Sequence, residues 1–155
     1  MPKRVALILA VFLITTIGVS PPVLADTANS DAQQAILVTG ASSGIGRNLA
    51  EKLAEEGYFV YAGARKQADL DALNKIPNIQ AVRLDVTKQD EIDAAVETVR
   101  TGDKGLYGLV NNAGVVTLGP ITEISEDELS WIFDVNLFGV YRVTKAFAPL
   151  VIESR

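Results

Sequence analysis

The sequence contains no histidine and no cysteine. These absences exclude disulfide bonds, thiol nucleophiles, imidazole bases and the usual zinc ligands. Asp and Glu number 19 against 14 Lys and Arg, for a net charge of -5, and no basic run is present to neutralise a nucleic-acid backbone. We therefore predict no metal site and no nucleic-acid partner, and we expect any chemistry to use hydroxyls, amides, carboxylates, lysine, arginine or a bound cofactor.

The N-terminus carries much of the apolar character of the chain. The 155 residues suffice for one domain, but the mean hydropathy of +0.23 is high. Two basic residues precede an apolar run from Val5 to Val19, which ends before Pro21-Pro22. Val23-Leu24-Ala25 then offers small or branched side chains where a signal peptidase reads. We predict that residues 1–25 are a signal peptide cleaved after Ala25 and that residues 26–34 are a polar linker.

This leader has a second interpretation. An uncleaved helix over Val5–Ala25 has 21 residues, just enough to span a bilayer as an anchor. Basic residues precede the apolar run and none follows it until Arg47, so both interpretations place the body on the exported side of the membrane. We expect a protein exported to the periplasm, the extracellular space or the endoplasmic reticulum lumen, or else a membrane-anchored one.

Beyond the leader, short apolar runs alternate with segments of helical periodicity. The apolar runs predict strands at Ala35–Thr39, Tyr58–Ala62, Ile79–Leu84 and Leu106–Val110. Helices are predicted at Gly44–Glu56, Ala68–Leu73, Glu91–Val99 and from Ser125 to about Ile152, the last with a Ser125/Glu128 capping box and a kink at Pro149. Strict alternation indicates an α/β fold in which helices wrap a parallel sheet.

The turn after the first predicted strand contains three glycines within Thr39-Gly40-Ala41-Ser42-Ser43-Gly44-Ile45-Gly46. Such a turn brings backbone N–H groups close to a diphosphate at the positive end of the following helix. A tight loop that serves packing alone is the alternative, but the position between a strand and a helix favours a dinucleotide site. The predicted binding residues here are Gly40, Ser42, Ser43, Gly44, Ile45 and Gly46.

The spacing of these glycines resembles that of the short-chain dehydrogenase/reductase family. Further matching motifs follow in order: Leu84-Asp85-Val86 and Asn111-Asn112-Ala113-Gly114 at strand ends, and Val135-Asn136 in the long helix. Gly105 to Asn112 is similar to the retinol, steroid and hydroxybutyrate dehydrogenase branch. The resemblance implies a Rossmann-type doubly wound sheet over residues 35–155, a nicotinamide dinucleotide, and an alcohol or carbonyl substrate. It also implies cofactor contacts at Asp85, Val86, Asn112, Ala113 and Gly114, and a catalytic role for Asn136, which holds a water in the family's proton relay.

The end of the second strand predicts which cofactor is used. An NAD site places a carboxylate there for the ribose hydroxyls, whereas a 2'-phosphate favours a guanidinium. Tyr61 to Lys66 contains no carboxylate, so Arg65, helped by Lys66, favours NADP over NAD. A solvated basic pair is the alternative, and Asp69 is expected to lie on the surface rather than bind the ribose.

The resemblance also implies a catalytic Ser and a Tyr-x-x-x-Lys pair. Tyr141 and Lys145 have that spacing, but the family's pair follows another strand. Moreover, five α-helical residues rotate by about 140 degrees, so Tyr141 would face away from Asn136. We expect both residues on a packed or solvated helix face.

The chain is therefore interpreted as the N-terminal part, or a truncated product, of an oxidoreductase, with a sheet incomplete at its C-terminal side. We expect weak NADP affinity, no reduction of substrate, and a fourth strand that forms an exposed apolar edge. A non-catalytic dinucleotide-binding module and an inactive fragment are the alternatives. Aromatic residues in the 125–152 helical region are expected in the core or in contacts of a homo-oligomer.

Overall fold

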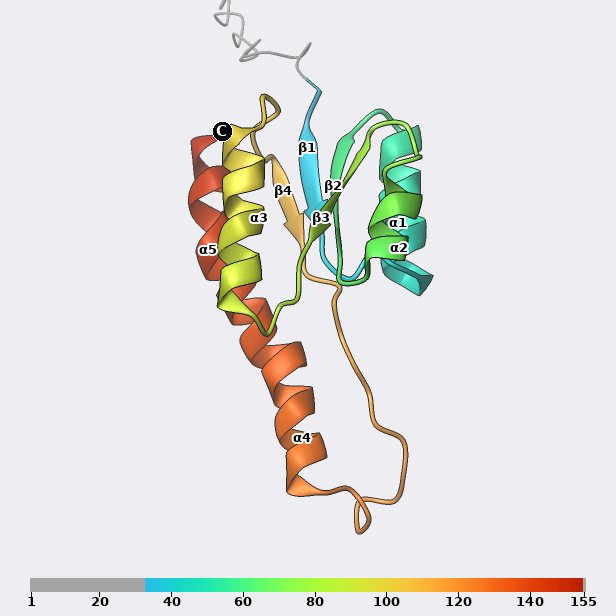
Figure 1. The fold of residues 1–155 in the computed structure, drawn as a ribbon. Coiled ribbons are helices and arrows are strands. Elements are labelled where there is room, and N and C mark those ends of the chain that lie inside the picture. Colours follow the sequence, from blue (N-terminus) through green and yellow to red (C-terminus); the bar gives the residue numbers. More distant parts are fainter. Residues whose placement is uncertain (1–32, 155) are drawn as a thin grey trace, which may run out of the picture. The chain divides into compact units, whose positions relative to one another are not determined.

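The computed structural model describes residues 33–154 (Figure 1). The predicted signal peptide and all but the last two residues of the linker lie outside the described residues. The strands are β1 (Ala35–Val38), β2 (Phe59–Ala64), β3 (Ile79–Arg83) and β4 (Gly108–Val110). The helical elements are α1 (Gly44–Glu55), α2 (Gln67–Leu73), α3 (Gln89–Thr101), α4 (Glu126–Phe133), the π-helical segment η1 (Asp134–Gly139) and α5 (Val140–Glu153).

The four strands form one parallel sheet in the order β3-β2-β1-β4. In the register of this sheet, Leu37 of β1 lies opposite Tyr61 of β2 and Leu109 of β4. The predicted α/β fold is confirmed, and the element ends differ from the predicted ones by about two residues at most. Within the described part of the chain, β4 is an edge strand, and its three residues are half-buried.

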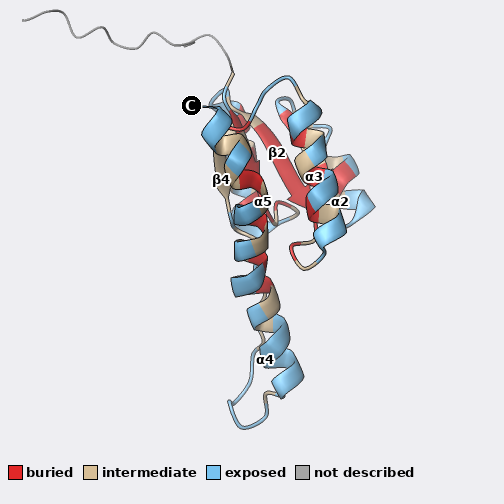
Figure 2. Cartoon of the chain, turned by 90° about the vertical axis from the view of Figure 1, so that its left-hand side faces the viewer, coloured by how far each residue is buried: buried red, intermediate tan, exposed pale blue. Residues whose placement is uncertain are grey.

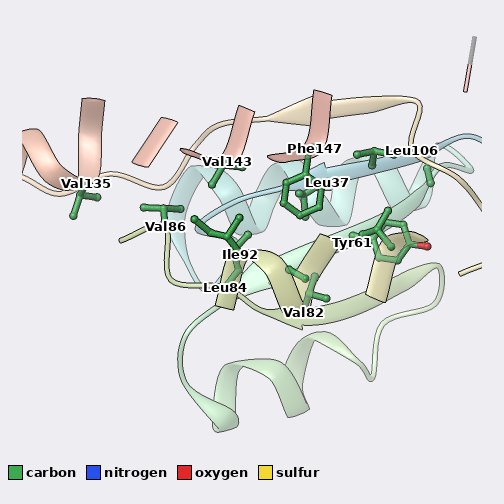
Figure 3. Close-up of a cluster of buried hydrophobic side chains, with 13 residues drawn as sticks. Leu37, Tyr61, Val82, Leu84, Val86, Ile92, Leu106, Val135, Val143 and Phe147 are labelled. Atoms are coloured by element: carbon green, nitrogen blue, oxygen red, sulfur yellow. The ribbon is translucent and has the colours of Figure 1, made fainter. Parts of the chain in front are cut away.

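Helices cover both faces of the sheet, α1 and α2 on one side and α3 and α5 on the other (Figure 1). Alternate residues of a strand point to opposite faces. Leu37 therefore packs into the cluster beneath α3 and α5, with Ile92 and Phe147 (Figure 3), while Val38 packs toward α1 and α2 with Ala50. Each face has its own apolar core, which fixes the strand ends that carry the site.

The long C-terminal helix differs from its prediction. The predicted capping box is confirmed: the Ser125 hydroxyl accepts from the Glu128 amide, and the Glu128 carboxylate accepts from the Ser125 amide. α5 runs through Pro149, where a kink was predicted, and the regular α pattern is interrupted at η1, which was not predicted. By length and a hydropathy of 1.2 the 28-residue helix Glu126–Glu153 resembles a membrane span, but Val143 and Phe147 pack into the domain core.

One part of the chain lies outside this packing. Residues 116–133, named here the arm, comprise a long loop and α4, and they extend away from the sheet (Figures 1 and 2). Most of its large apolar side chains are exposed, and these are Val116, Leu118, Ile121, Leu129, Trp131 and Phe133. The arm therefore contributes no buried side chain to either core cluster.

The described chain begins beside the amino ends of the strands, whereas the turns that follow the strands lie at their carboxyl ends. Gln33 Nε2 donates hydrogen bonds to the carbonyl oxygen of Gly57 at 3.0 Å and to Asn78 Oδ1 at 3.1 Å. These acceptors lie in the turns that lead into β2 and β3. Gln33 thus fastens the start of the domain beside the amino ends of its strands.

Candidate cofactor site

The turns at the carboxyl ends of the strands enclose a cleft of about 380 Å³. Carboxyl ends of parallel strands meet at one edge, where α/β proteins place their ligands. The cleft is lined by Gly40, Ser42, Ser43, Ile45, Gly46, Gly63, Ala64, Arg65, Leu84, Asp85, Val86, Asn112, Ala113, Gly114, Val115 and Val135. Every predicted cofactor-binding residue except Gly44 is in this lining.

Two glycines of the first turn have no room for a side chain. A Cβ on Gly40 would lie 2.7 Å from the Ala113 Cα, and the φ of +66° at Gly40 is one that L-residues rarely adopt. A Cβ on Gly46 would lie 2.3 Å from Asn112 Nδ2 and 2.4 Å from the Gly40 carbonyl oxygen. These glycines let the turns after β1 and β4 come into direct contact along the floor of the cleft.

Thr39 joins the same two turns by hydrogen bonds. Its side chain is buried, and its hydroxyl accepts from the amides of Asn112 at 2.9 Å and Ala113 at 3.0 Å. In return, Asn112 Nδ2 donates to the carbonyl oxygens of Thr39 at 2.9 Å and Gly40 at 3.2 Å. Since buried polar groups are stable only when they are hydrogen-bonded, this reciprocal set fixes the shape of the cleft.

The start of α1 faces the cleft with its backbone donors uncapped. The N-cap residue Ser43 makes no side-chain hydrogen bond to the first helical turn, and that turn contains no acidic residue. Helix N-termini carry partial positive charge and donors that suit anions. Ile45, which is 81% exposed, adds an apolar wall at the mouth of the cleft.

A second hollow of about 340 Å³ adjoins the cleft and shares Ser42, Ser43 and Arg65 with it. Lys66 and Asp69 complete its lining. Among residues 33–154, neither Arg65 nor Lys66 takes part in an ion pair. The hollow is therefore open to an external anion. Asp69, which was expected on the surface, is half-buried and lines this hollow.

Asp85 remains charged at the far wall of the cleft. Partial burial raises the pKa of its carboxyl group, but hydrogen bonds from the Thr87 hydroxyl and amide, together with the charges of Arg65 and Lys88, outweigh burial and leave the pKa below its ordinary value. The two hydrogen bonds, at 2.7 Å and 3.0 Å, both end on Oδ1. Oδ2 is the oxygen that these bonds leave available to a ligand's donor.

Asn136 does not line the cleft but holds a residue that does. Its Oδ1 accepts from the Val115 amide and its Nδ2 donates to the Val115 carbonyl oxygen, both at 2.8 Å. Gly139 of the same segment packs directly against Val86, another residue of the cleft lining, because a Cβ at Gly139 would lie 2.6 Å from Val86 Cγ2. The π-helical segment η1 thus contacts two turns of the cleft. Such segments often occur at functional sites.

Tyr141 and Lys145 are absent from the cleft lining, as expected. Tyr141 is 60% exposed, and Lys145 Nζ lies 5.7 Å from the centre of its ring. The regular α-helix assumed between Asn136 and Tyr141 was wrong, however, because most of that interval belongs to the wider turn of η1. The rotation of about 140 degrees therefore does not apply to this pair.

Five lining residues were not among the predicted site residues. They are Gly63, Ala64, Leu84, Val115 and Val135. Their shared property is position at or near a strand end or on η1, and none has distinctive chemistry. The position of Gly63 and Ala64 at the end of the second predicted strand was a usable signal, whereas Val135 enters only through the path of η1.

A family model described as short chain dehydrogenase matches residues 34–155. The chain belongs to the short-chain dehydrogenase family. The mitochondrial D-beta-hydroxybutyrate dehydrogenase of Bos taurus is 40% identical over 129 residues, which cover 76% of this chain and 37% of that protein. The NADPH-dependent 1-acyldihydroxyacetone phosphate reductase of Schizosaccharomyces pombe is 37% identical over 127 residues, 81% of this chain and 43% of that protein.

Among solved structures, a variant of the actinorhodin polyketide ketoreductase with NADPH aligns with a TM-score of 0.73 and 32% identity. The alignment covers 79% of this chain and 49% of the ketoreductase chain. This short-chain dehydrogenase therefore spans less than half the length of each of these three proteins. The similarity expected to the hydroxybutyrate dehydrogenase branch is confirmed.

Proposed function

We propose that the cleft binds NADP as part of an oxidoreductase that transfers hydride between the nicotinamide and an alcohol or ketone. The observation that carries the proposal is the convergence of an uncapped helix start, two glycines without space for a Cβ, and an Arg65 free of ion pairs in the described part of the chain, all on one cleft. When bound, the nicotinamide supplies the hydride donor or acceptor.

The residues present fit such a ligand. The first turn of α1 provides donors for a diphosphate, and Gly46 lets this turn pack directly against Asn112 and Gly40. Asp85 Oδ2, which the two Thr87 hydrogen bonds leave open, would accept from an adenine amino group. Asn136 remains the residue proposed to hold a water of the proton relay, and its side-chain amide also binds Val115 at the cleft wall.

The preference for NADP rests on charge. The hollow beside the cleft carries the cations of Arg65 and Lys66 against a single carboxylate, Asp69. A planar guanidinium binds phosphate through two parallel hydrogen bonds, which a ribose hydroxyl does not require. The names of two of the compared proteins also mention NADPH. The names of the hydroxybutyrate and retinol dehydrogenase relatives suggest a hydroxy acid or a retinoid as the substrate, and a steroid-like substrate is proposed from the similarity of Gly105 to Asn112 alone.

Calorimetric titration of the chain with NADPH and with NADH tests this proposal. We expect tighter binding of NADPH, and Arg65→Ala should weaken NADPH binding by about tenfold while changing NADH binding little. Arg100→Ala, an exposed arginine outside the cleft, is the matched control. Absence of affinity for either coenzyme would refute the site, and equal affinities would refute the NADP preference alone.

A test of turnover separates binding from catalysis. The cleft lining contains no tyrosine and no lysine. We therefore expect residues 33–154 to bind the coenzyme without reducing a ketone. Oxidation of NADPH by the purified chain in the presence of a ketone would contradict this expectation.

The arm supports a proposed homo-oligomer. Trp131, Phe133 and Phe138 are each about half exposed along the predicted contact region, whereas Phe147 is fully buried in the core. Exposed apolar patches of this kind mark association surfaces. Sedimentation of the chain should show a species larger than the monomer, and Phe133→Glu should dissociate it. A monomeric wild-type chain would contradict the proposal.

Export is a separate proposal, based on the sequence of residues 1–25. Expression with a C-terminal tag, followed by cell fractionation and N-terminal sequencing, should yield an exported protein that begins at Asp26. A membrane-bound protein that retains Met1 would indicate the anchor instead, and recovery of the tag from the cytosol would contradict both.

A further inference from the structure

We propose that Arg83 is a positioning residue for cofactor selectivity, which it exerts by holding the turn that carries Arg65. The inference rests on the proposed NADP function and identifies a residue outside the hollow that sets its geometry. Arg83 is the last residue of β3 and pairs in register with Ala64 of β2. Its side chain therefore starts beside the residue that precedes Arg65.

The guanidinium of Arg83 spans the turn between β2 and α2. Its Nη1 donates to the Arg65 carbonyl oxygen at 2.5 Å and its Nη2 donates to Gln67 Oε1 at 2.8 Å. Gln67 in turn donates from Nε2 to Asp71 Oδ1 at 2.8 Å, one turn along α2. The two guanidinium nitrogens of Arg83 therefore bind the residues on either side of Lys66.

This turn has few other side-chain restraints. Lys66 is the N-cap residue of α2 and makes no side-chain capping bond, and Arg65 and Lys66 are both exposed. A bidentate phosphate contact requires the Arg65 backbone to hold a fixed direction, since a shift of the turn moves the whole fork. Fixing the Arg65 carbonyl is therefore a direct way to preorganise the guanidinium that faces the hollow.

The charge of Arg83 has a second effect. Both of its acceptors are neutral, and in the part of the chain that the structure describes it forms no ion pair. The turn is thus stabilised by a third cation rather than by a carboxylate that would repel a phosphate dianion. Substitution of Arg83 by lysine separates the two effects, because lysine keeps the positive charge but has one ammonium group in place of the two guanidinium nitrogens that bind the turn.

Competing titrations with adenosine 2',5'-bisphosphate and 5'-AMP measure the selectivity without requiring turnover. We expect the wild-type chain to prefer the 2'-phosphorylated probe, and Arg83→Lys to reduce the ratio of the two dissociation constants by about fivefold through weaker binding of the bisphosphate. Gln67→Met, which removes one acceptor without changing charge, should lower the same ratio by a smaller factor. Affinity for 5'-AMP should stay unchanged, which a general loss of folding would not permit.

Arg100→Lys is the matched control, because its guanidinium pairs with Glu97 on α3 and lies outside both hollows. If the wild-type chain prefers the bisphosphate and both Arg83→Lys and Gln67→Met keep that preference, the positioning role is overturned while the NADP proposal stands. If only Arg83→Gln, which also removes the charge, lowers the preference, Arg83 acts by charge, and the positioning role is again overturned. If the wild-type chain shows no preference, the NADP proposal itself fails, and with it this inference.

Discussion

The cleft and the arm are ordered by different means. In the cleft, Thr39 is 1% exposed and the contact at Gly46 leaves no space for one more carbon atom. In the arm, Leu118 is 90% exposed; the Ser125 capping box fixes the start of α4, and the hydrogen bonds between Asn136 and Val115 lie just outside residues 116–133, at the base of the arm. The cleft is thus shaped by close backbone packing, whereas the arm is fixed at a few polar points and presents apolar side chains outward.

The difference has an energetic basis. Buried groups that lose a partner cannot be rescued by water, so each contact in the cleft is costly to remove. Groups of the arm are near solvent, and water replaces much of what a substitution removes. Substitutions at the closely packed contacts of the cleft should therefore have large effects, and substitutions at half-buried or exposed groups small ones, which the following measurements test in order of expected effect.

The largest effect is expected from Gly46→Ala. The added Cβ would overlap Asn112 Nδ2 and the Gly40 carbonyl oxygen, so the turns after β1 and β4 must separate, at a cost of about 3 kcal/mol or more. Gly119→Ala in the arm is the matched control, since no atom lies within 4 Å of the position that its Cβ would take. Urea unfolding measures the loss in unfolding free energy for each variant. Equal losses would contradict the claim that the cleft is more closely packed than the arm.

Thr39→Val should have the next largest effect. The two side chains have the same shape, but valine leaves the amides of Asn112 and Ala113 without their acceptor inside the domain. We expect a loss of about 2 to 3 kcal/mol in the free energy of unfolding. Thr39→Ser keeps the hydroxyl and should retain most of the stability. A valine variant as stable as the serine variant would show that these hydrogen bonds contribute little.

Asn136→Ala tests the two hydrogen bonds between Asn136 and Val115 at the base of the arm. It removes two hydrogen bonds to Val115, whose backbone groups can then reach water, so the expected loss is only about 1 kcal/mol. Hydrogen exchange should show much faster exchange at the Val115 amide with little change at Val38 in β1. Loss of protection across the sheet would mean that the arm and the cleft form one cooperative unit.

The smallest effect concerns pH. The pKa of Asp85 is lowered in the folded chain, so its ionised form contributes stability above the ordinary carboxyl pKa, and this contribution is lost as pH falls through the lowered folded value. Asp85→Asn should therefore flatten the decline in unfolding free energy between about pH 5 and about pH 2. Parallel pH profiles for the two proteins would show that the hydrogen bonds of Thr87 do not stabilise the charge.

Most of the fold was predictable because its signals are local. Apolar runs specified each strand, and the Ser125/Glu128 pair specified the start of α4. Proline is a visible local signal, so a kink was predicted at Pro149, whereas the interruption of the α pattern at η1 was not predicted. The segment η1 coincides with two tertiary contacts, the bonds of Asn136 to the loop after β4 and the packing of Gly139 on Val86, and neither partner is nearby in the sequence.

The residues of the site likewise include some with local sequence signals and some whose role depends on tertiary contacts. Residues of the glycine-rich turn and of the strand-end motifs were predictable, because parallel strands bring their carboxyl ends together. Thr39, which joins two of these turns, was quoted in a motif but given no role, since its contacts lie more than seventy residues away in the sequence. Arg83 carried no signal at all, because its importance depends on the pairing of β2 with β3.

The position of Gln33 bears on how the domain can be fused to a partner or immobilised on a surface. It enters the fold where β1 begins, and the four residues of this strand, at about 3.3 Å each, separate that entry from the cofactor cleft by roughly 13 Å. A fusion partner, a surface linker or a lipid tether joined ahead of Gln33 therefore leaves the coenzyme entrance unobstructed. Immobilisation through this end is the orientation best suited to capturing nucleotides from solution.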